Sequence, residues 1–479
     1  MTGSLHDTIC ALATPPGEGG IGIVRLSGEK AVEVAGRVVR LRSGQALDAI
    51  QARLLCLCDL VLDASTGGSS QPAGPDVPLD EALVVVMRAP RSFTAEDVVE
   101  IQCHGGPYLL QRVLDELLRA GARLAEPGEF TKRAFLNGRI DLTQAEAVLD
   151  TIRAKTAAGL RLAQEQLQGR LSADIHRHRE TLIRLVAHVE AAMDFADEDL
   201  TFISSAQLRD ELDRTERELL RLAESCREGR MLREGVAVAL VGRPNVGKSS
   251  LLNALLDTDR AIVTPIAGTT RDVLDEMLNV RGIPIRLLDT AGLRETDDPV
   301  EREGVRRSRQ AMEQAELLLV VVDGAHGLTE DDRRALASCP GASRLLLINK
   351  CDLPSGLEPS ELEPFCRTLG LEPQEAVVRV SAKTGEGLDT LRDAIRRTLI
   401  RPEFEAGETV LVTRLRHRAA LMTAVQALSH AGESVRRGLA GEFVAMDLRG
   451  ALDALGELTG AVTTDDILDR IFGEFCIGK

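Results

Sequence analysis

Apolar residues follow two different rhythms along this chain. Up to about residue 143 they form short runs of strand type, at 21–24, 82–87 and 98–101, together with one helical stretch at 108–120. This mixture predicts an α+β domain over residues 1–143.

A helical rhythm follows that domain. From 144 to 234, Leu, Ile and Val recur every three or four residues among charged residues, with no proline, and the pattern returns in 401–479. Between them, residues 235–400 alternate apolar strand-length runs with helices, which is typical of a parallel α/β sheet. We therefore predict a multidomain α/β plus α protein, in which the α/β domain is inserted into a discontinuous helical domain.

Composition narrows the classes of function. The formal net charge of -16 disfavours broad binding to nucleic acid without excluding a local basic face, and aromatic residues at 2% leave little for base stacking. The nine cysteines show no CxxC pair, which favours a reducing compartment. The run that contains Cys56-Leu-Cys58 is expected to be a strand with alternating burial rather than a metal site. Without a membrane-length apolar run or a signal segment, we expect a cytoplasmic protein with no membrane partner.

The α/β zone contains the pattern of a phosphate-binding loop. Gly242-Arg-Pro-Asn-Val-Gly-Lys-Ser-Ser250 follows an apolar run at 236–241 and precedes a helical start at 251–256. In such a loop, glycines let backbone N–H groups surround phosphates at a helix N-terminus, Lys248 reaches the β- and γ-phosphates, and Ser249 binds Mg²⁺. The nucleotide-binding residues expected here are Asn245, Val246, Gly247, Lys248, Ser249 and Ser250.

Two later motifs predict that the nucleotide is a guanine nucleotide. Asn349-Lys-Cys-Asp352 ends the apolar run 345–348, and the Asp352 carboxylate can accept two donors of guanine that adenine lacks. Ser381-Ala-Lys383 ends the run 377–380 and can close the guanine O6 side through backbone N–H groups. The resulting domain resembles a Ras-like GTPase domain, and its expected base-binding residues are Asn349, Lys350, Asp352, Ser381, Ala382 and Lys383.

Two switch motifs lie between the phosphate loop and the base motifs. Gly268-Thr-Thr-Arg-Asp272 offers a threonine to Mg²⁺ and the γ-phosphate, and Asp289-Thr-Ala-Gly292 ends the run 285–288 facing the metal. Leu293 then stands where many small GTPases have a water-orienting Gln. Either the protein is a slow switch that awaits an activating protein, or another residue or a cation supplies the catalytic help. The switch residues expected at the GTP site are Thr269, Thr270, Asp289, Thr290, Ala291 and Gly292.

Signatures in every zone resemble those of one family. Ala13-Thr-Pro-Pro-Gly-Glu-Gly-Gly20, the two switch motifs and the terminal Cys476-Ile-Gly-Lys479 are similar, in the same order, to the MnmE (TrmE) family of tRNA-uridine-modification GTPases. The resemblance implies GTP hydrolysis coupled to addition of a carboxymethylaminomethyl or aminomethyl group at C5 of the wobble uridine of certain tRNAs. It also implies a homodimer that forms a heterotetramer with an FAD-dependent tRNA-modification subunit of the MnmG type.

The resemblance further implies a folate site in the N-terminal domain. The family's contacts to 5,10-methylene- or 5-formyl-tetrahydrofolate fall on Arg25, Glu100 and Lys479, and a family Lys falls on Arg139, which keeps the charge but changes the donor geometry. Taken without the resemblance, Arg25 and Glu100 have the simpler interpretation of structural or surface charges.

Cys476 has three interpretations. In the family, the tail reaches back to the folate site, which puts Cys476 near the modification chemistry as a nucleophile or as a positioned group. A Cys four residues from the end also resembles a prenylation box, which Gly478 and Lys479 fit poorly.

For hydrolysis, the resemblance implies activation by K⁺ and by pairing of two GTPase domains. The K⁺ ligands fall on Asn245, Thr264, Ile266 and Thr269, with Thr264 also counted in the GTP site, and Mg²⁺ takes Ser249 and Thr270. Glu301 matches the catalytic acidic residue that arranges the attacking water, although by itself it has the pattern of a solvated charge.

Two other functions stay open on the sequence. The chain can be a ribosome-assembly or RNA-chaperone GTPase that modifies nothing, or a folate enzyme of the aminomethyl-transferase type with a regulatory GTPase. Arg414-Leu-Arg-His-Arg418 is a candidate contact for tRNA phosphates, or equally a helix face at a domain seam.

Overall fold

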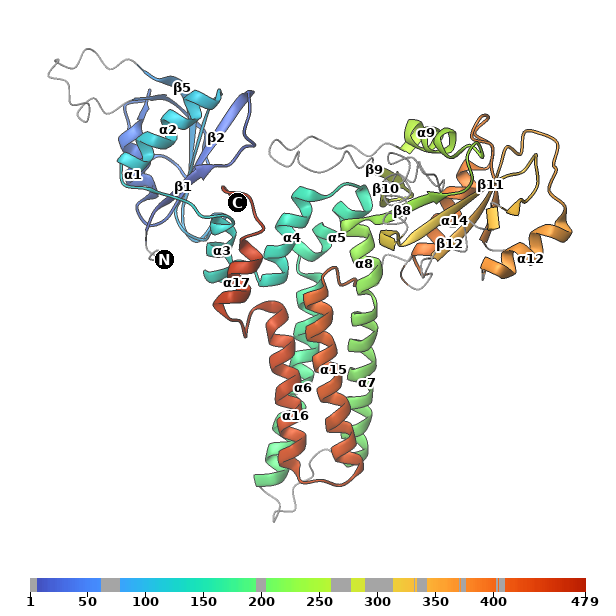
Figure 1. The fold of residues 1–479 in the computed structure, drawn as a ribbon. Helices are drawn as coiled ribbons and strands as arrows, with labels where there is room; N and C mark the ends of the chain where they lie inside the picture. The colour runs from blue at the N-terminus through green and yellow to red at the C-terminus, as the bar shows by residue number, and fades with distance from the viewer. Residues whose placement is uncertain are drawn as a thin grey trace, which may run out of the picture. The chain divides into compact units, whose positions relative to one another are not determined.

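The computed structural model describes most of the chain in two compact units. The described residues are 7–61, 78–194, 204–259, 277–288, 313–330, 332–333, 343–369, 371, 376–401, 404 and 410–479. Residues 7–149 and 459–479 make one unit, and the described residues of 150–458 make the other (Figure 1). No helix within these ranges combines the length and apolarity that a membrane span requires.

The first unit is built on a seven-stranded sheet in the order β3-β4-β5-β6-β2-β1-β7. Its neighbours pair antiparallel except for the parallel pair β1–β7. The strands are β1 (Ile9–Leu12), β2 (Gly19–Ser27), β3 (Val39–Leu41), β4 (Cys56–Leu60), β5 (Asp80–Met87), β6 (Val98–Gly105) and β7 (Arg123–Leu124). The strands expected at 21–24, 82–87 and 98–101 are therefore confirmed.

Helices α1 (Ala31–Val38) and α2 (Pro107–Arg119) bury their apolar faces against this sheet, and a 3₁₀ turn, η1 (Leu47–Ala49), joins the same core. Cys58 is fully buried in β4 whereas its neighbour Leu57 is exposed, so the predicted alternation on this strand is confirmed. No cluster of metal-ligating side chains occurs in the described part of the chain.

The C-terminal end of the chain packs within this first unit. Helices α3 (Glu129–Leu136) and α17 (Asp465–Phe472) share a small core in which Phe472 lies between Phe135 and Phe475. Residues separated by more than 300 positions are thereby brought together, which places the terminal tail beside the N-terminal sheet.

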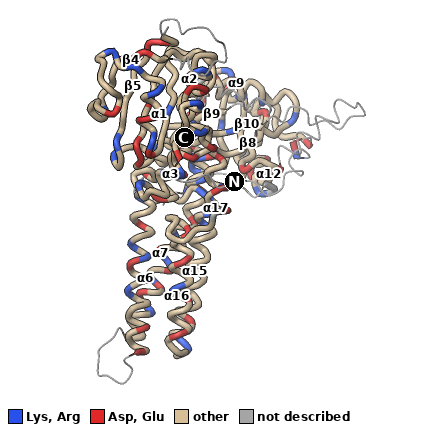
Figure 2. Tube along the Cα trace, turned by 90° about the vertical axis from the view of Figure 1, so that its left-hand side faces the viewer, with Lys and Arg blue, Asp and Glu red and all other residues tan. Residues whose placement is uncertain are grey.

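The second unit contains a bundle of four long helices, α6 (Arg170–Asp194), α7 (Ser205–Glu224), α15 (Leu415–Arg436) and α16 (Gly441–Thr459). Their apolar stripes form one core, and α7 packs along α15 although the GTPase zone separates them in sequence (Figure 1). The expected discontinuous helical domain is thus confirmed. Charged residues of both signs are spread along these helices (Figure 2).

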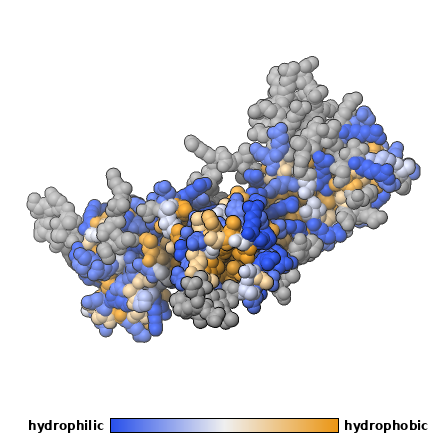
Figure 3. Space-filling model, turned by 90° about the horizontal axis from the view of Figure 1, so that it is seen from below, coloured by the Kyte–Doolittle hydropathy of each residue, from blue (hydrophilic) through white to orange (hydrophobic). Residues whose placement is uncertain are grey.

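Two shorter helices belong to the second unit, α5 (Ala157–Leu167) and α8 (Cys226–Glu234). Helix α4 (Leu142–Arg153) instead adds Leu142, Ala145 and Leu149 to the core that α3 and α17 share. Where α15 passes into α16, Leu439, Phe443 and Met446 are exposed. The view onto that end of the bundle shows apolar residues among hydrophilic ones (Figure 3).

The inserted domain is a six-stranded sheet in the order β13-β12-β11-β8-β10-β9, parallel except for the pair β9–β10. Its strands are β8 (Val236–Val241), β9 (Met277–Val280), β10 (Ile283–Leu288), β11 (Leu317–Asp323), β12 (Ser343–Asn349) and β13 (Val377–Arg379). Its described helices are α9 (Lys248–Asp259), α12 (Pro359–Leu369) and α14 (Leu388–Leu399). Continuous burial of β8 and β11 confirms the predicted parallel α/β sheet.

Candidate functional site

The phosphate loop connects the buried strand β8 to helix α9, as predicted. Gly247 has φ +97°, and a Cβ there would lie 2.2 Å from Nδ2 of Asn349, so only glycine fits this close approach. Because α9 begins at Lys248, the loop ends at the N-terminus of a helix, where backbone N–H groups favour anions.

Lys248 lies across this loop. Its Nζ donates to the backbone oxygens of Gly242 at 2.6 Å and of Arg243 at 2.9 Å. Burial lowers the pKa of the Lys248 ammonium. The ammonium is thus fixed within the loop, whereas Asn245, Ser249 and Ser250 are exposed to solvent.

Asn349 joins the three motif loops of the expected nucleotide site. Its side chain is buried, its Nδ2 donates to the oxygen of Val246 at 2.8 Å, and its Oδ1 accepts from the backbone N–H of Ala382 at 3.1 Å. Ser381 Oγ donates to Asp352 Oδ1 at 2.7 Å, which orients the exposed carboxylate expected to bind guanine. The structure therefore brings together the phosphate loop and both base motifs.

Lys350 links this site to a residue that sequence reasoning missed. Its Nζ donates to the oxygen of Asn245 at 2.9 Å and to Oδ2 of Asp323 at 2.7 Å. Burial works to raise the pKa of Asp323, but hydrogen bonds from Lys350, the Ala325 N–H and His326 dominate and lower it. The sequence signal that could have identified Asp323 as a site residue is its position directly after the apolar run of β11.

Arg243 is a second contact that the sequence did not indicate. Its Nε lies 3.4 Å from Oδ1 of the buried Asp332. This ion pair links the phosphate loop to the segment after β11. Lys383, the last residue of its motif, is exposed. The remaining predicted residues lie outside the described part of the chain: Thr264, Ile266, Thr269, Thr270, Asp289, Thr290, Ala291, Gly292 and Glu301.

In the first unit, Arg25 and Glu100 face each other across the paired strands β2 and β6. Arg25 Nε donates to Glu100 Oε1 at 2.8 Å, and Arg25 Nη2 lies 2.7 Å from the same oxygen. Arg25 Nη1 is buried and has no hydrogen-bond partner among the described residues. The guanidinium lies over Phe93, 5.4 Å from the ring centroid.

Lys479 comes from the far end of the chain to the same place. Burial lowers the pKa of its ammonium, the nearby Arg25 lowers it further, and Glu100 opposes both. Gly478 holds the tail there: its φ is +98°, and a Cβ would lie 2.0 Å from the backbone oxygen of Leu12.

Arg139 reaches the site through Phe93. Its Nη1 donates to the Phe93 oxygen at 2.7 Å, and its guanidinium lies 5.1 Å from the ring centroid. The ring therefore lies within cation–π range of both Arg139 and Arg25. Phe93 was missed from sequence, where one aromatic between polar residues forms no pattern.

Cys476 is exposed, and only its backbone is held. Its oxygen accepts from the N–H of Gly128 at 3.5 Å and from the N–H of Lys479 at 3.3 Å. No hydrogen bond reaches its thiol from any residue that the structure describes. The structure therefore shows an exposed thiol on the terminal tail.

A phosphate loop after a buried strand, closed by Asn-Lys-x-Asp and Ser-Ala-Lys loops, defines the class as P-loop GTPases that bind guanine nucleotides. The attached α+β unit and the split helical bundle distinguish this chain from a GTPase domain alone.

Comparison with known proteins identifies the family. Residues 8–139 match the family model of the GTP-binding protein TrmE N-terminus, and residues 142–476 match that of the MnmE helical domain. The chain is 48% identical over 479 residues to the tRNA modification GTPase MnmE of Heliobacterium modesticaldum, with 99% of each chain covered. It is 49% identical over 475 residues to the protein of that name from Symbiobacterium thermophilum, covering 99% of this chain and 100% of the relative. The chain belongs to the tRNA modification GTPase MnmE family.

Among solved structures, a GDP-bound variant of Era from Aquifex aeolicus is 30% identical over 40% of this chain and 65% of its own. The TM-score is 0.29, too low for the likeness to add to the assignment.

Proposed function

We propose that this protein hydrolyses GTP and, with an FAD-dependent partner, adds a carboxymethylaminomethyl or aminomethyl group to C5 of the wobble uridine of certain tRNAs. The observation that carries this proposal is the gathering of Lys479 with Arg25 and Glu100 in a chain that also has a guanine-nucleotide site. A GTPase that only assists RNA assembly has no use for such a second site.

Tetrahydrofolate fits the N-terminal site because the site combines a carboxylate with unsatisfied positive charge. A pterin ring presents a paired N–H and amino edge that a carboxylate such as Glu100 can accept, and the buried Nη1 of Arg25 needs an acceptor. Lys479 and Arg139 add charge for the anionic end of a folate. When bound, the folate supplies the one-carbon unit.

The nucleotide site supports GTP hydrolysis. With GTP bound, Lys248 would contact the phosphates, Asp352 would accept the guanine donors, and Ser249 with Thr270 would hold Mg²⁺. K⁺ would bind to Asn245, which is exposed in the phosphate loop at φ +66°, and to Thr264, Ile266 and Thr269. Glu301 arranges the attacking water, and pairing of two GTPase domains completes the site.

The assembly we propose is a cytoplasmic homodimer joined through residues 1–143, with which the FAD-dependent subunits form a heterotetramer. The helical parts, 144–234 and 401–479, connect the GTPase domain, 235–400, to the folate site. Hydrolysis thereby drives a conformational cycle that organises the modification chemistry.

Nucleoside analysis of tRNA from cells that lack this protein tests the proposal. We expect the wobble-uridine modification to disappear and to return with the parent gene. Unchanged modification accompanied by a ribosome-assembly defect would instead favour the assembly GTPase.

Cys476 is the residue that we propose lies near the modified base, since its thiol is exposed on the tail that leads to Lys479. A Cys476→Ser protein should hydrolyse GTP normally and modify tRNA poorly. Normal modification by this variant would restrict the tail to a structural role.

A further inference from the structure

A basic cleft lies on the helical part of the second unit. Helix α7, helix α8 and the first turns of α15 surround it, and its volume is about 490 Å³. Four arginines and a single carboxylate, that of Glu224, line it: the arginines are Arg227, Arg230, Arg401 and Arg418. Such a concentration of positive charge is unexpected in a chain with a formal net charge of -16.

Two of these arginines form ion pairs within the protein. Arg230 Nη2 lies 3.1 Å from Glu316 Oε1, and Arg401 Nε lies 2.6 Å from Oε1 of Glu228, which is fully buried. Arg401 also lies 4.7 Å from the ring centroid of Phe404. Both arginines therefore already have a carboxylate partner within the protein.

The other two arginines are available to a ligand. Arg227 on α8 and Arg418 on α15 are both exposed, and the side chains of neither make a hydrogen bond or ion pair with any residue that the structure describes. Arg418 lies close enough to the buried Cys226 in the cleft to act on its thiol electrostatically. Two uncompensated guanidinium groups thus face one concave surface.

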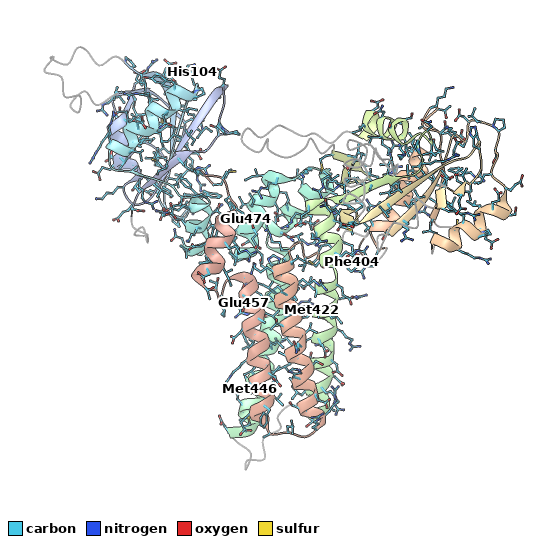
Figure 4. The ribbon with its side chains drawn as sticks, viewed as in Figure 1. His104, Phe404, Met422, Met446, Glu457 and Glu474 are labelled. Carbon is cyan, nitrogen blue, oxygen red and sulfur yellow. The ribbon has the colours of Figure 1, made fainter. Side chains whose placement is uncertain are left out.

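Apolar side chains lie beside these charges. Leu415 and Met422 are 57% and 40% exposed. They stand three residues before and four residues after Arg418 on α15, which is helical spacing, and Met422 is labelled on that helix in Figure 4. A volume of about 490 Å³ is within the range of small-molecule sites. The cleft therefore suits a ligand that combines a flat apolar ring with an anionic group.

We propose that this cleft binds tRNA, with Arg227 and Arg418 on backbone phosphates and one unstacked nucleotide on Leu415 and Met422. This inference rests on the proposed function, which requires a tRNA surface. Arginine forks match phosphate oxygens in pairs, and RNA is commonly recognised through unstacked nucleotides.

The neighbouring arginines do not belong to this surface. Arg414 Nη2 donates to Asp150 at 2.8 Å, Arg416 Nη1 donates to the oxygen of Glu457 at 2.8 Å, and His417 between them is fully buried. The sequence left open whether residues 414–418 contact phosphates or form a helix face at a domain seam. Of these residues, only Arg418 therefore serves as a phosphate contact in the proposed site.

The test measures binding of an unmodified tRNA transcript to the full-length protein across a NaCl series. We expect Arg227→Ala/Arg418→Ala to weaken binding and to reduce the slope of log Kd against log [salt] by about 1 for each lost phosphate contact, about 2 in all. Arg214→Ala/Arg217→Ala is the matched control: it removes the same charge from exposed positions of α7 outside the cleft, and the slope should not change.

A second variant separates the two halves of the cleft. Leu415→Ser/Met422→Ser should weaken binding without altering the salt slope, because apolar contacts release no counterions.

Equal slopes for the cleft variant and its control would overturn the inference. The inference would also be overturned if the cleft variant still bound tRNA but no longer bound the FAD-dependent partner. That result would indicate that the cleft binds an acidic peptide of the partner. Absence of salt-dependent tRNA binding by the parent would also overturn it, and nucleoside analysis of the deletion cells would then judge the proposed function separately.

Discussion

The two candidate sites of this protein are built in opposite ways. The nucleotide site is made of short contiguous motifs at the ends of neighbouring strands, which the order of the sheet brings together. The N-terminal site joins residues from β2, β6 and the last position of the chain, and ion pairs and a pinned tail hold it. A motif site can thus be read from local sequence, whereas the second site exists only after folding.

The difference extends to how each site is stabilised. The nucleotide loops are tied by hydrogen bonds to backbone atoms, as by Asn349 and Lys248. The segments around the N-terminal site depend on charge. Arg133, only 2% exposed, pairs with Asp7, Glu96 and Glu129 from three separate segments. We therefore expect charge substitutions to unfold the first unit and to leave the nucleotide site intact.

The largest expected effect is on stability. Arg133→Met removes the buried guanidinium that pairs with the half-buried Asp7, Glu96 and Glu129. Because Asp7 and Glu129 keep Arg123 as a partner, the first unit should be destabilised by about 2–4 kcal/mol. Chemical denaturation of the full chain, followed by a probe in each unit, measures this. A uniform loss in both units would contradict the separation that we infer.

The same network predicts acid sensitivity. Burial works to raise the pKa values of Asp7 and Glu129, but hydrogen bonds from Arg123 and Arg133 lower both below their ordinary 3.8 and 4.5. Their contribution is complete above the ordinary values and is lost as pH falls through the lower folded values. The first unit should therefore lose stability below about pH 4.5, and Arg133→Met should flatten that dependence.

Lys248→Ala should reduce GTP hydrolysis by about 10²–10³-fold, because it removes a fixed positive charge at the phosphates. Folate affinity, measured by calorimetry, should not change. A parallel loss of folate binding would show that the two sites are not independent.

Gly478→Val should displace the tail from Leu12 and reduce folate affinity by about tenfold or more, since Lys479 is then no longer held beside Arg25. GTPase activity should persist. Ile477→Ala is the matched control, because Ile477 is 51% exposed and its loss should leave folate affinity near that of the parent.

The last comparison changes only the monovalent cation in the buffer. K⁺ should stimulate turnover strongly and Na⁺ weakly, since oxygens spaced for K⁺ fit the smaller ion poorly. Asn245→Ala should reduce the K⁺ response, and Glu301→Ala should slow hydrolysis while nucleotide affinity survives. Equal rates in K⁺ and Na⁺ buffers would count against cation-assisted hydrolysis.

Much of the fold was predictable because apolar periodicity records which faces are buried. The strands before the phosphate loop and before the Asn-Lys-x-Asp motif were found from their apolar runs, and the split helical bundle from its spacing. Asp323, Phe93 and the Arg243–Asp332 contact were missed, because a partner chosen by tertiary packing has no local pattern. Arg25 and Glu100 would have been taken for ordinary charges without the family resemblance.

Modification of tRNA in one set of cells tests the link between the two sites most directly. Cells that lack this protein would be given the parent, Lys248→Ala or Arg25→Ala at equal levels, and their wobble nucleosides would be quantified. We predict that the parent restores the modification and that neither variant does, because each lacks one of two required sites. Full modification with either variant would contradict the claim that GTP hydrolysis and the N-terminal site act in one reaction.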